Sequence, residues 1–174
     1  MFIATLISRD VLLNLGLVPA VFLDRPWTIV TNMFVHAGFF HLFVNMITLF
    51  FFGTFLARLV GQNKFLLLYF GGGILGNIFY ILLGEPISIA VGASGAVFAL
   101  AGALVVMMPN LRVLIWGIIP ARLWVAVLIF FVFLSLPFIA EAFRIAWQAH
   151  LGGLIAGLIA GYFFRRQQRY YYIR

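Results

Sequence analysis

The chain alternates between long apolar segments and short polar ones. Five apolar segments are clear, and they cover residues 36–57, 65–83, 93–108, 123–139 and 145–164. Charged residues or turn-forming glycine and proline separate them, as in Gly84-Glu85-Pro86. Apolar runs of this length without a period of two are typical of helices, and a bilayer admits only helices or closed barrels. The pattern therefore predicts five membrane-spanning helices.

Residues 1–23 depart from this pattern. They are largely apolar but contain Arg9, Asp10 and Asn14 near their middle. Each charge at a helix centre costs about 2.5–3.5 kcal/mol on membrane insertion, so a sixth span centred there is disfavoured. We expect residues 1–7 to be the end of a truncated first span and residues 11–23 to lie at the membrane interface.

Composition agrees with a polytopic membrane protein. Of the 174 residues, 66% are apolar or aromatic and only 9% are charged, against roughly 45–50% and 25% in soluble domains. The high apolar content and the absence of cysteine exclude the disordered and disulfide-rich classes. We expect one all-α, polytopic membrane helical bundle over residues 1–174. Within it, residues 1–35 form the truncated span and an outer loop, 36–164 the five-helix core and 165–174 a basic cytoplasmic tail.

The net charge of +7 follows from the orientation of the helices. If the helices alternate, one side of the membrane receives eight of the basic residues, and the other receives three together with all four acids. By the positive-inside rule the basic side is cytoplasmic, so the C-terminus is cytoplasmic and Glu85 and Glu141 face outward. Nucleic acid is therefore not an expected partner. The eight basic residues are Arg58, Lys64, Arg112, Arg122, Arg165, Arg166, Arg169 and Arg174.

Four polar side chains fall at a similar depth on three of the predicted helices. At about 1.5 Å per residue from the outer face, His41 and His150 lie about 8 Å deep, Asn45 is one turn below His41, and Ser94 is at its helix end. A neutral imidazole can take the proton of a serine hydroxyl. A histidine, an asparagine amide or a helix N-terminal N–H can stabilise an oxyanion. Because the clear spans contain no carboxylate, the set predicts a Ser94–His150 dyad without a third member.

Small residues flank both members of the predicted dyad. Small residues at a spacing of four let two membrane helices approach closely, and a Ser–His hydrogen bond between helices needs that approach. A further glycine cluster predicts a close contact on the 65–83 helix. These residues are Gly92 and Gly95 beside Ser94, Gly153, Gly157 and Gly161 after His150, and Gly71, Gly72, Gly73 and Gly76 on the 65–83 helix.

Three stretches follow one another along the chain: His36-Ala-Gly-Phe-Phe-His41-Leu-Phe-Val-Asn45, Gly92-Ala-Ser94-Gly95 and His150-Leu-Gly-Gly-Leu-Ile-Ala-Gly157. Together they resemble the motifs of the rhomboid intramembrane serine proteases, and the resemblance runs from about Pro26 to the end of the last helix. It implies a compact helical bundle with a water-filled cavity open to the outer face. It also implies that Ser94 is the nucleophile, His150 the general base, and His41 and Asn45 the oxyanion-stabilising pair.

The implied activity is that of a serine endopeptidase of a prokaryotic plasma membrane, with no metal and no cofactor. Its expected partners are transmembrane protein substrates, which it cleaves within or near their membrane segments, and membrane lipids. In the family, the segment matching 123–139 and the loop matching 140–146 gate substrate entry. We expect Phe130, Phe131, Phe133 and Phe138 to serve this gate and Pro137 to loosen its outer end. The chain departs from the family in lacking most of a first helix and in having Thr28 after Trp27 where many members have arginine.

Two alternatives differ in class from a protease. A catalytically inactive rhomboid-like protein would bind transmembrane segments without cutting them, but such proteins usually lack the serine or the histidine, and this chain has both. A small transporter or channel would need polar groups at several depths. The inner halves of the predicted helices are almost wholly apolar, which argues against a polar pathway.

Overall fold

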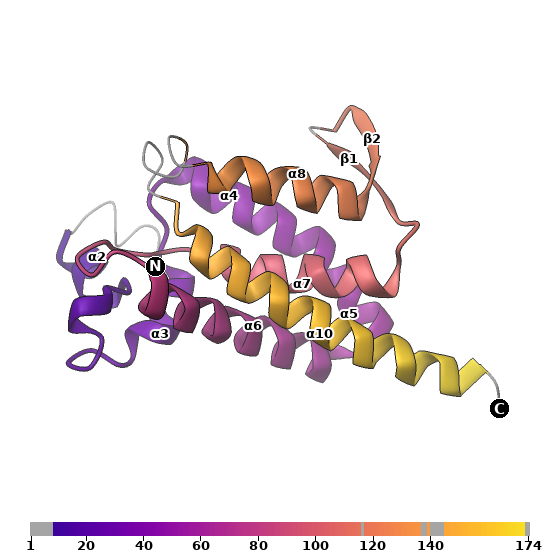
Figure 1. Ribbon diagram of the computed structural model, residues 1–174, viewed down its shortest axis with the longest axis horizontal. Helices are drawn as coiled ribbons and strands as arrows, with labels where there is room; N and C mark the ends of the chain where they lie inside the picture. The colour runs from indigo at the N-terminus through magenta and orange to yellow at the C-terminus, as the bar shows by residue number, and fades with distance from the viewer. Residues whose placement is uncertain (1–8, 116, 137–138, 140–144, 173–174) are drawn as a thin grey trace.

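The protein is a bundle of helices (Figure 1). The computed structural model describes residues 9–115, 117–136, 139 and 145–172. Each of the five apolar segments contains helix, as predicted. The helices are α4 (Phe39–Thr48), continued through a π-helical turn, η3 (Leu49–Gly53), into α5 (Thr54–Val60), and then α6 (Gln62–Leu83), α7 (Ser94–Met107), α8 (Leu123–Ser135) and α10 (Trp147–Tyr172).

The helices differ in whether they are long enough to cross a membrane. Among the described residues, two meet the requirement of length and apolarity: Phe39–Val60 and Gln62–Leu83, each of 22 residues. α7 and α8 are apolar but shorter. At about 1.5 Å per residue, α8 rises about 20 Å, whereas the hydrocarbon core of a bilayer is about 30 Å thick. The prediction of five full spans is therefore not confirmed, although all five segments are helical.

The segment before α4 consists of short helices held by hydrogen bonds to neighbouring backbone. The Arg25 guanidinium donates to the Leu13 carbonyl at 2.8 Å, and the Thr31 hydroxyl donates to the Leu15 carbonyl at 2.8 Å. The described part of the chain begins at Arg9, so the expected end of a truncated span, residues 1–7, lies outside it. The short helices are α2 (Arg9–Leu15), η1 (Pro19–Val21), α3 (Thr28–Thr31) and η2 (Asn32–Phe34).

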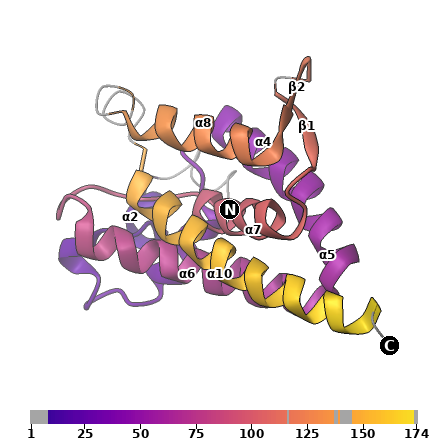
Figure 2. The same cartoon turned by 45° about the vertical axis from the view of Figure 1, so that its right-hand side comes forward.

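Helix α7 forms the centre of the bundle. In both views α6 and α10 lie on one side of it, and α4 and α8 on the other (Figures 1 and 2). Leu100 and Leu104 of α7 are completely buried, and most of its other residues are buried as well. A helix that is apolar on every side is stable only when other helices surround it. Burial therefore fixes α7, and with it Ser94 at its first position.

Glycines bring α10 into backbone contact with α7, as their spacing predicts. A Cβ atom on Gly153 would clash with the Gly95 carbonyl oxygen, and one on Gly157 would clash with that of Ala99. On α6, a Cβ atom on Gly76 would lie 2.5 Å from the Ala149 carbonyl oxygen. A Cβ atom on Gly71 would have no atom within 4 Å, so the expected close contact on α6 does not extend to it. The three helices around the candidate dyad are thus packed backbone to backbone.

A β-hairpin links α7 to α8, where the sequence pattern indicated only a turn-forming connection. Strand β1 (Arg112–Ile115) pairs antiparallel with β2 (Ile119–Arg122), and Arg112 lies opposite Arg122 in the register. Helix α8 follows β2 directly. In contrast to α7, the buried residues of α8 are confined to Leu123 and Ala126, near its first turn.

Candidate active site

Ser94 and His150 are hydrogen bonded across the α7–α10 interface. Ser94 is the first residue of α7, and His150 lies in the first turn of α10. The Ser94 Oγ and the His150 Nε2 are 2.8 Å apart, and His150 is buried. A neutral imidazole at this distance can accept the proton of the hydroxyl and so generate a nucleophilic oxygen. The pair that the sequence predicted is therefore within hydrogen-bonding distance.

The imidazole of His150 is positioned by an aromatic ring. It stacks on Phe98, with ring centroids 4.6 Å apart and an interplanar angle of 23°. Phe98 lies one turn after Ser94 on α7, so both side chains face α10. Within the described part of the chain, the buried Nδ1 of His150 has no hydrogen-bond partner. The sequence analysis did not single out Phe98, although its i+4 spacing from Ser94 was a usable signal.

Gly92 brings His41 close to the segment that precedes α7. Gly92 has a φ of +116°, a conformation that residues with side chains rarely adopt. A Cβ at this position would lie 2.8 Å from the His41 Nε2. The Gly92 N–H also donates to the Asn32 carbonyl at 2.9 Å. A residue larger than glycine would therefore displace either the His41 ring or the loop that leads to Ser94.

The sequence pattern places Asn45 in the candidate site, but its side chain is hydrogen bonded within its own helix. Its side chain is buried, and its Nδ2 donates to the His41 carbonyl at 2.8 Å, one turn earlier on α4. One proton of the amide remains for another acceptor. The structure thus brings Ser94 and His150 into direct contact and His41 beside Gly92, whereas the hydrogen bond described for the Asn45 side chain stays within α4.

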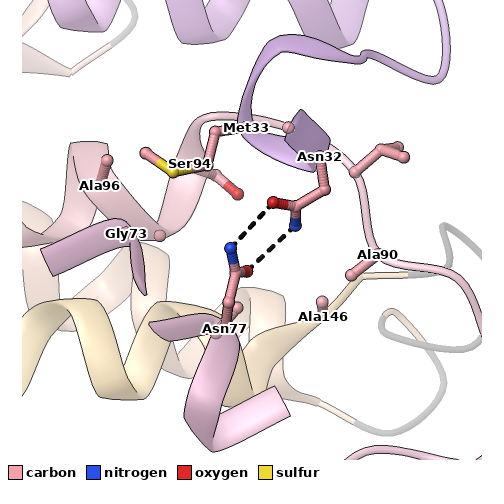
Figure 3. Close-up of a pocket in the computed structure, with 12 residues that line it drawn as sticks. Asn32, Met33, Gly73, Asn77, Ala90, Ser94, Ala96 and Ala146 are labelled. Carbon is pink, nitrogen blue, oxygen red and sulfur yellow. Dashed lines mark hydrogen bonds between the residues drawn. The ribbon is translucent and has the colours of Figure 1, made fainter. Parts of the chain in front are cut away.

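A buried amide pair, not singled out as a site by the sequence analysis, lies next to Ser94. The Asn32 Nδ2 donates to the Asn77 Oδ1 at 3.0 Å, and the Asn77 Nδ2 donates to the Asn32 Oδ1 at 2.8 Å and to the Ile29 carbonyl at 2.7 Å. Figure 3 shows the two amides facing each other, with Ser94 beside them. A cavity of about 10 Å³ is lined by both asparagines and Ser94, close to the space that one water molecule needs. A polar residue within an apolar helix, Asn77 in α6, was the available sequence signal.

Metal ligation has no candidate site in the described residues. They contain no group of three or more histidine, cysteine, aspartate or glutamate side chains close enough to hold an ion. His36 and His41 do lie together, with ring centroids 5.3 Å apart in an edge-to-face arrangement.

Fold and site together define a membrane-type helical protein in which a partly buried serine is hydrogen bonded to a buried histidine at the ends of two closely packed helices. The family model of the rhomboid domain matches residues 23–167. The chain is 37% identical over 147 residues to YdcA, a rhomboid-family protein of Bacillus subtilis, and covers 71% of it. The chain belongs to the rhomboid family, which makes it an integral membrane protein with protease relatives.

Other relatives show how much family membership says about activity. The rhomboid protease GluP of Bacillus subtilis is 34% identical over 134 residues, which are 77% of this chain but 25% of GluP. A protein of Arabidopsis thaliana named inactive RHOMBOID-like protein 8 is 32% identical over 136 residues, 75% of this chain and 36% of that protein. The family thus includes proteases and at least one member named as inactive.

Proposed function

We propose that this protein is an intramembrane serine endopeptidase that cleaves transmembrane segments of other membrane proteins through a Ser94–His150 dyad. The observation that carries the proposal is the 2.8 Å hydrogen bond between the Ser94 Oγ and the His150 Nε2. An arrangement of nucleophile and base within hydrogen-bonding reach is the signature of an activated serine.

The chemistry follows from the proposed roles. His150 Nε2 takes the proton of the Ser94 hydroxyl as the oxygen attacks a substrate carbonyl, and the peptide becomes a tetrahedral oxyanion. The backbone N–H of Ser94, at the positive end of the α7 dipole, stabilises this charge together with the side chains of His41 and Asn45. The protonated His150 then gives its proton to the leaving amine as the C–N bond breaks. In the second half, His150 takes a proton from water as the water oxygen attacks the acyl-enzyme ester, and it returns that proton to the Ser94 oxygen as the ester C–O bond breaks and the carboxylic acid product leaves. Phe98 holds the imidazole in plane throughout these steps.

The position of the site suggests how substrate reaches it. Ser94, His150 and His41 all lie at the end of the bundle where α7, α10 and α4 begin. By the distribution of basic residues, this end faces outward from a prokaryotic plasma membrane, and the C-terminus is cytoplasmic. We infer that helix α8, whose buried residues lie near its first turn, is the part of the bundle that moves aside for a substrate helix. Pro137, Phe138 and residues 140–144 of this gate lie outside the described residues.

The domain is the whole chain under this proposal. The residues before 36 supply the outer loop, 36–164 the catalytic core, and 165–174 the basic cytoplasmic tail. The chain covers 71% of YdcA but 25% of GluP, so the proposed activity concerns the rhomboid domain that the relatives share.

Labelling with a fluorophosphonate serine probe tests the proposal. The detergent-solubilised protein is expected to be labelled, and Ser94→Ala and His150→Ala are each expected to abolish labelling. Ser135→Ala is the matched control, because the Ser135 hydroxyl bonds only to the Phe131 carbonyl of its own helix in the described structure, at 2.7 Å, and lies on α8. Equal labelling of the wild type and the Ser94→Ala variant would refute the dyad. An unlabelled wild type that still binds transmembrane peptides would support the inactive, segment-binding alternative.

A further inference from the structure

The β1–β2 hairpin presents exposed apolar side chains at the side of the helical bundle. Leu114, Ile118 and Ile119 are 60%, 79% and 57% exposed. Exposed apolar residues on α4, α6 or α8 are expected in a membrane protein, because lipid tails surround its helices. The hairpin is different, because it is not part of any helix. The backbone carbonyls and N–H groups along its edges need water or another polar partner, so lipid tails are not expected to surround it. Its exposed apolar surface needs a separate explanation.

The hairpin extends sideways from the bundle. In Figures 1 and 2 the hairpin projects from the beginning of α8, across the helix axes. Along the helix axes, α10 extends farther than the hairpin does. The helices on either side of it, α7 and α8, have 14 and 13 residues and so rise only about 20 Å each. Trp124 in the first turn of α8 is exposed, and tryptophan is enriched at the level of the lipid headgroups. A bilayer that puts Trp124 at its headgroup level would put the hairpin at the same level, pointing over the surrounding lipid.

Two arginines lie opposite each other at the base of the hairpin. Arg112 and Arg122 are direct partners in the antiparallel register, which puts both on the same face of the ribbon as Leu114. Like charges directly opposite each other destabilise a strand pair. In the part of the chain that the structure describes, neither guanidinium pairs with a carboxylate. An anion between the two side chains would remove the repulsion and accept several hydrogen bonds.

We propose that the β1–β2 hairpin is a membrane-interface anchor that binds anionic phospholipid. The apolar tip around Ile118 enters the boundary between headgroups and acyl chains, and the Arg112–Arg122 pair binds the lipid phosphate. A phospholipid fits both features at once. It carries a phosphate for the arginine pair and, apart from it, acyl chains for the apolar tip. Under the proposed orientation this is the cytoplasmic leaflet.

The anchor would fix one end of α8. Leu123 is almost completely buried, and its N–H donates to the Leu111 carbonyl at 2.8 Å, just before β1. The hairpin and the first turn of α8 are thus one hydrogen-bonded unit. Lipid bound to the hairpin holds this end of α8 at a set depth, whereas the rest of the helix has few buried residues.

A single label at the hairpin tip tests whether it enters the leaflet. The chain has no cysteine, so Ile118→Cys carries one environment-sensitive fluorophore in nanodiscs of phosphatidylcholine and phosphatidylglycerol. The expected result is a blue-shifted emission that doxyl-labelled lipid quenches and aqueous iodide does not. Asn63→Cys, at an exposed polar position near the start of α6, is the control and is expected to respond to iodide. Iodide quenching at Ile118 equal to that at Asn63 would overturn the anchor.

The phosphate site is tested by titrating the detergent-solubilised protein with fluorescent phosphatidylglycerol. Arg112→Gln and Arg122→Gln are each expected to weaken binding about fivefold, since a basic residue near an anionic membrane contributes about 1 kcal/mol. Arg58→Gln removes the same charge from the exposed end of α5 and is expected to leave binding unchanged. Equal weakening by all three variants would reduce the site to general charge attraction and overturn it. Circular dichroism of each variant verifies that the helices are intact.

Inorganic phosphate separates the two possible sources of the anion. Phosphate at the concentration of the lipid is expected not to displace phosphatidylglycerol, because it lacks the acyl chains that contact the tip. Displacement by phosphate alone would contradict a lipid site. Neither measurement depends on proteolytic activity, so failure of the dyad and failure of the anchor are distinguishable.

Discussion

The α7–α10 interface and helix α8 are built on opposite principles. At the interface, glycines put backbone against backbone, and a single added carbon at Gly153 or Gly157 would clash with a carbonyl of α7. Helix α8 buries only Leu123 and Ala126 and otherwise presents large side chains to its surroundings. A serine–histidine bond of 2.8 Å needs the first kind of packing, since small shifts would break it. Access for another protein's helix needs the second kind. The α7–α10 interface therefore sets the distance between Ser94 and His150, whereas α8 is the part of the bundle that can move.

The largest expected effect is at the glycines of the interface. Gly157→Leu forces α10 away from α7 and is expected to lower the free energy of unfolding by about 3 kcal/mol, the upper end for overpacking. Gly71→Leu is the matched control on α6, where nothing lies within 4 Å of the added carbon, and is expected to change stability by about 0.5 kcal/mol or less. Unfolding in mixed micelles measures both. Equal losses at the two glycines would contradict the backbone-contact interpretation.

The amide pair beside Ser94 should give a smaller loss. Asn77→Leu leaves both polar groups of the buried Asn32 side chain unpaired and is expected to cost about 1–3 kcal/mol. Asn32→Leu should cost less, because the Asn77 amide keeps its bond to the Ile29 carbonyl. In a double-mutant cycle by thermal unfolding, the double leucine variant is expected to lose less than the sum of the two single variants. Additive losses would mean that the two amides do not stabilise each other.

The aromatic contact on His150 should affect reactivity more than stability. Phe98→Leu removes a stacked pair worth about 0.5–1.5 kcal/mol, so the rate of Ser94 labelling should fall about twofold to tenfold. Phe133→Leu, on the exposed side of α8, is the control and should leave the labelling rate unchanged. The comparison is made with initial rates of fluorophosphonate labelling. A rate unaffected by Phe98→Leu would show that the stack does not position the imidazole.

The smallest expected effect on stability is on α8 itself. Phe133→Ala removes an exposed ring and is expected to change the free energy of unfolding by about 0.5 kcal/mol or less. The same change should alter the rate at which a transmembrane substrate is cleaved, because it lies on the helix proposed to move. Phe131→Ala is the companion variant, since the centroids of the Phe131 and Phe98 rings are 6.2 Å apart. Cleavage rates unchanged in both variants would contradict the gate.

Much of the fold could be predicted because its signals are local. Lipid-facing helices need long apolar runs, so five helical segments followed from the sequence alone. Glycines at every fourth position after His150 indicated the close approach of α10, which the structure bears out. Asn32, Asn77 and Phe98 were not singled out, because each acquires its role from a partner on another element or from a ring that must stack. The hairpin was missed because its strands are four residues each, too short for a clear period of two.

The sequence by itself determined the class of protein, the helical segments and which polar residues had to be explained, because the cost of polar groups in a membrane is a property of each residue and its neighbours. Only the tertiary structure decided that Ser94 and His150 are 2.8 Å apart and that His41 lies against Gly92. It also decided that the Asn45 amide bonds within its own helix and that two arginines face each other across a hairpin. Those facts depend on how separate helices and strands pack, and a packing distance is set by all the side chains between two backbones at once.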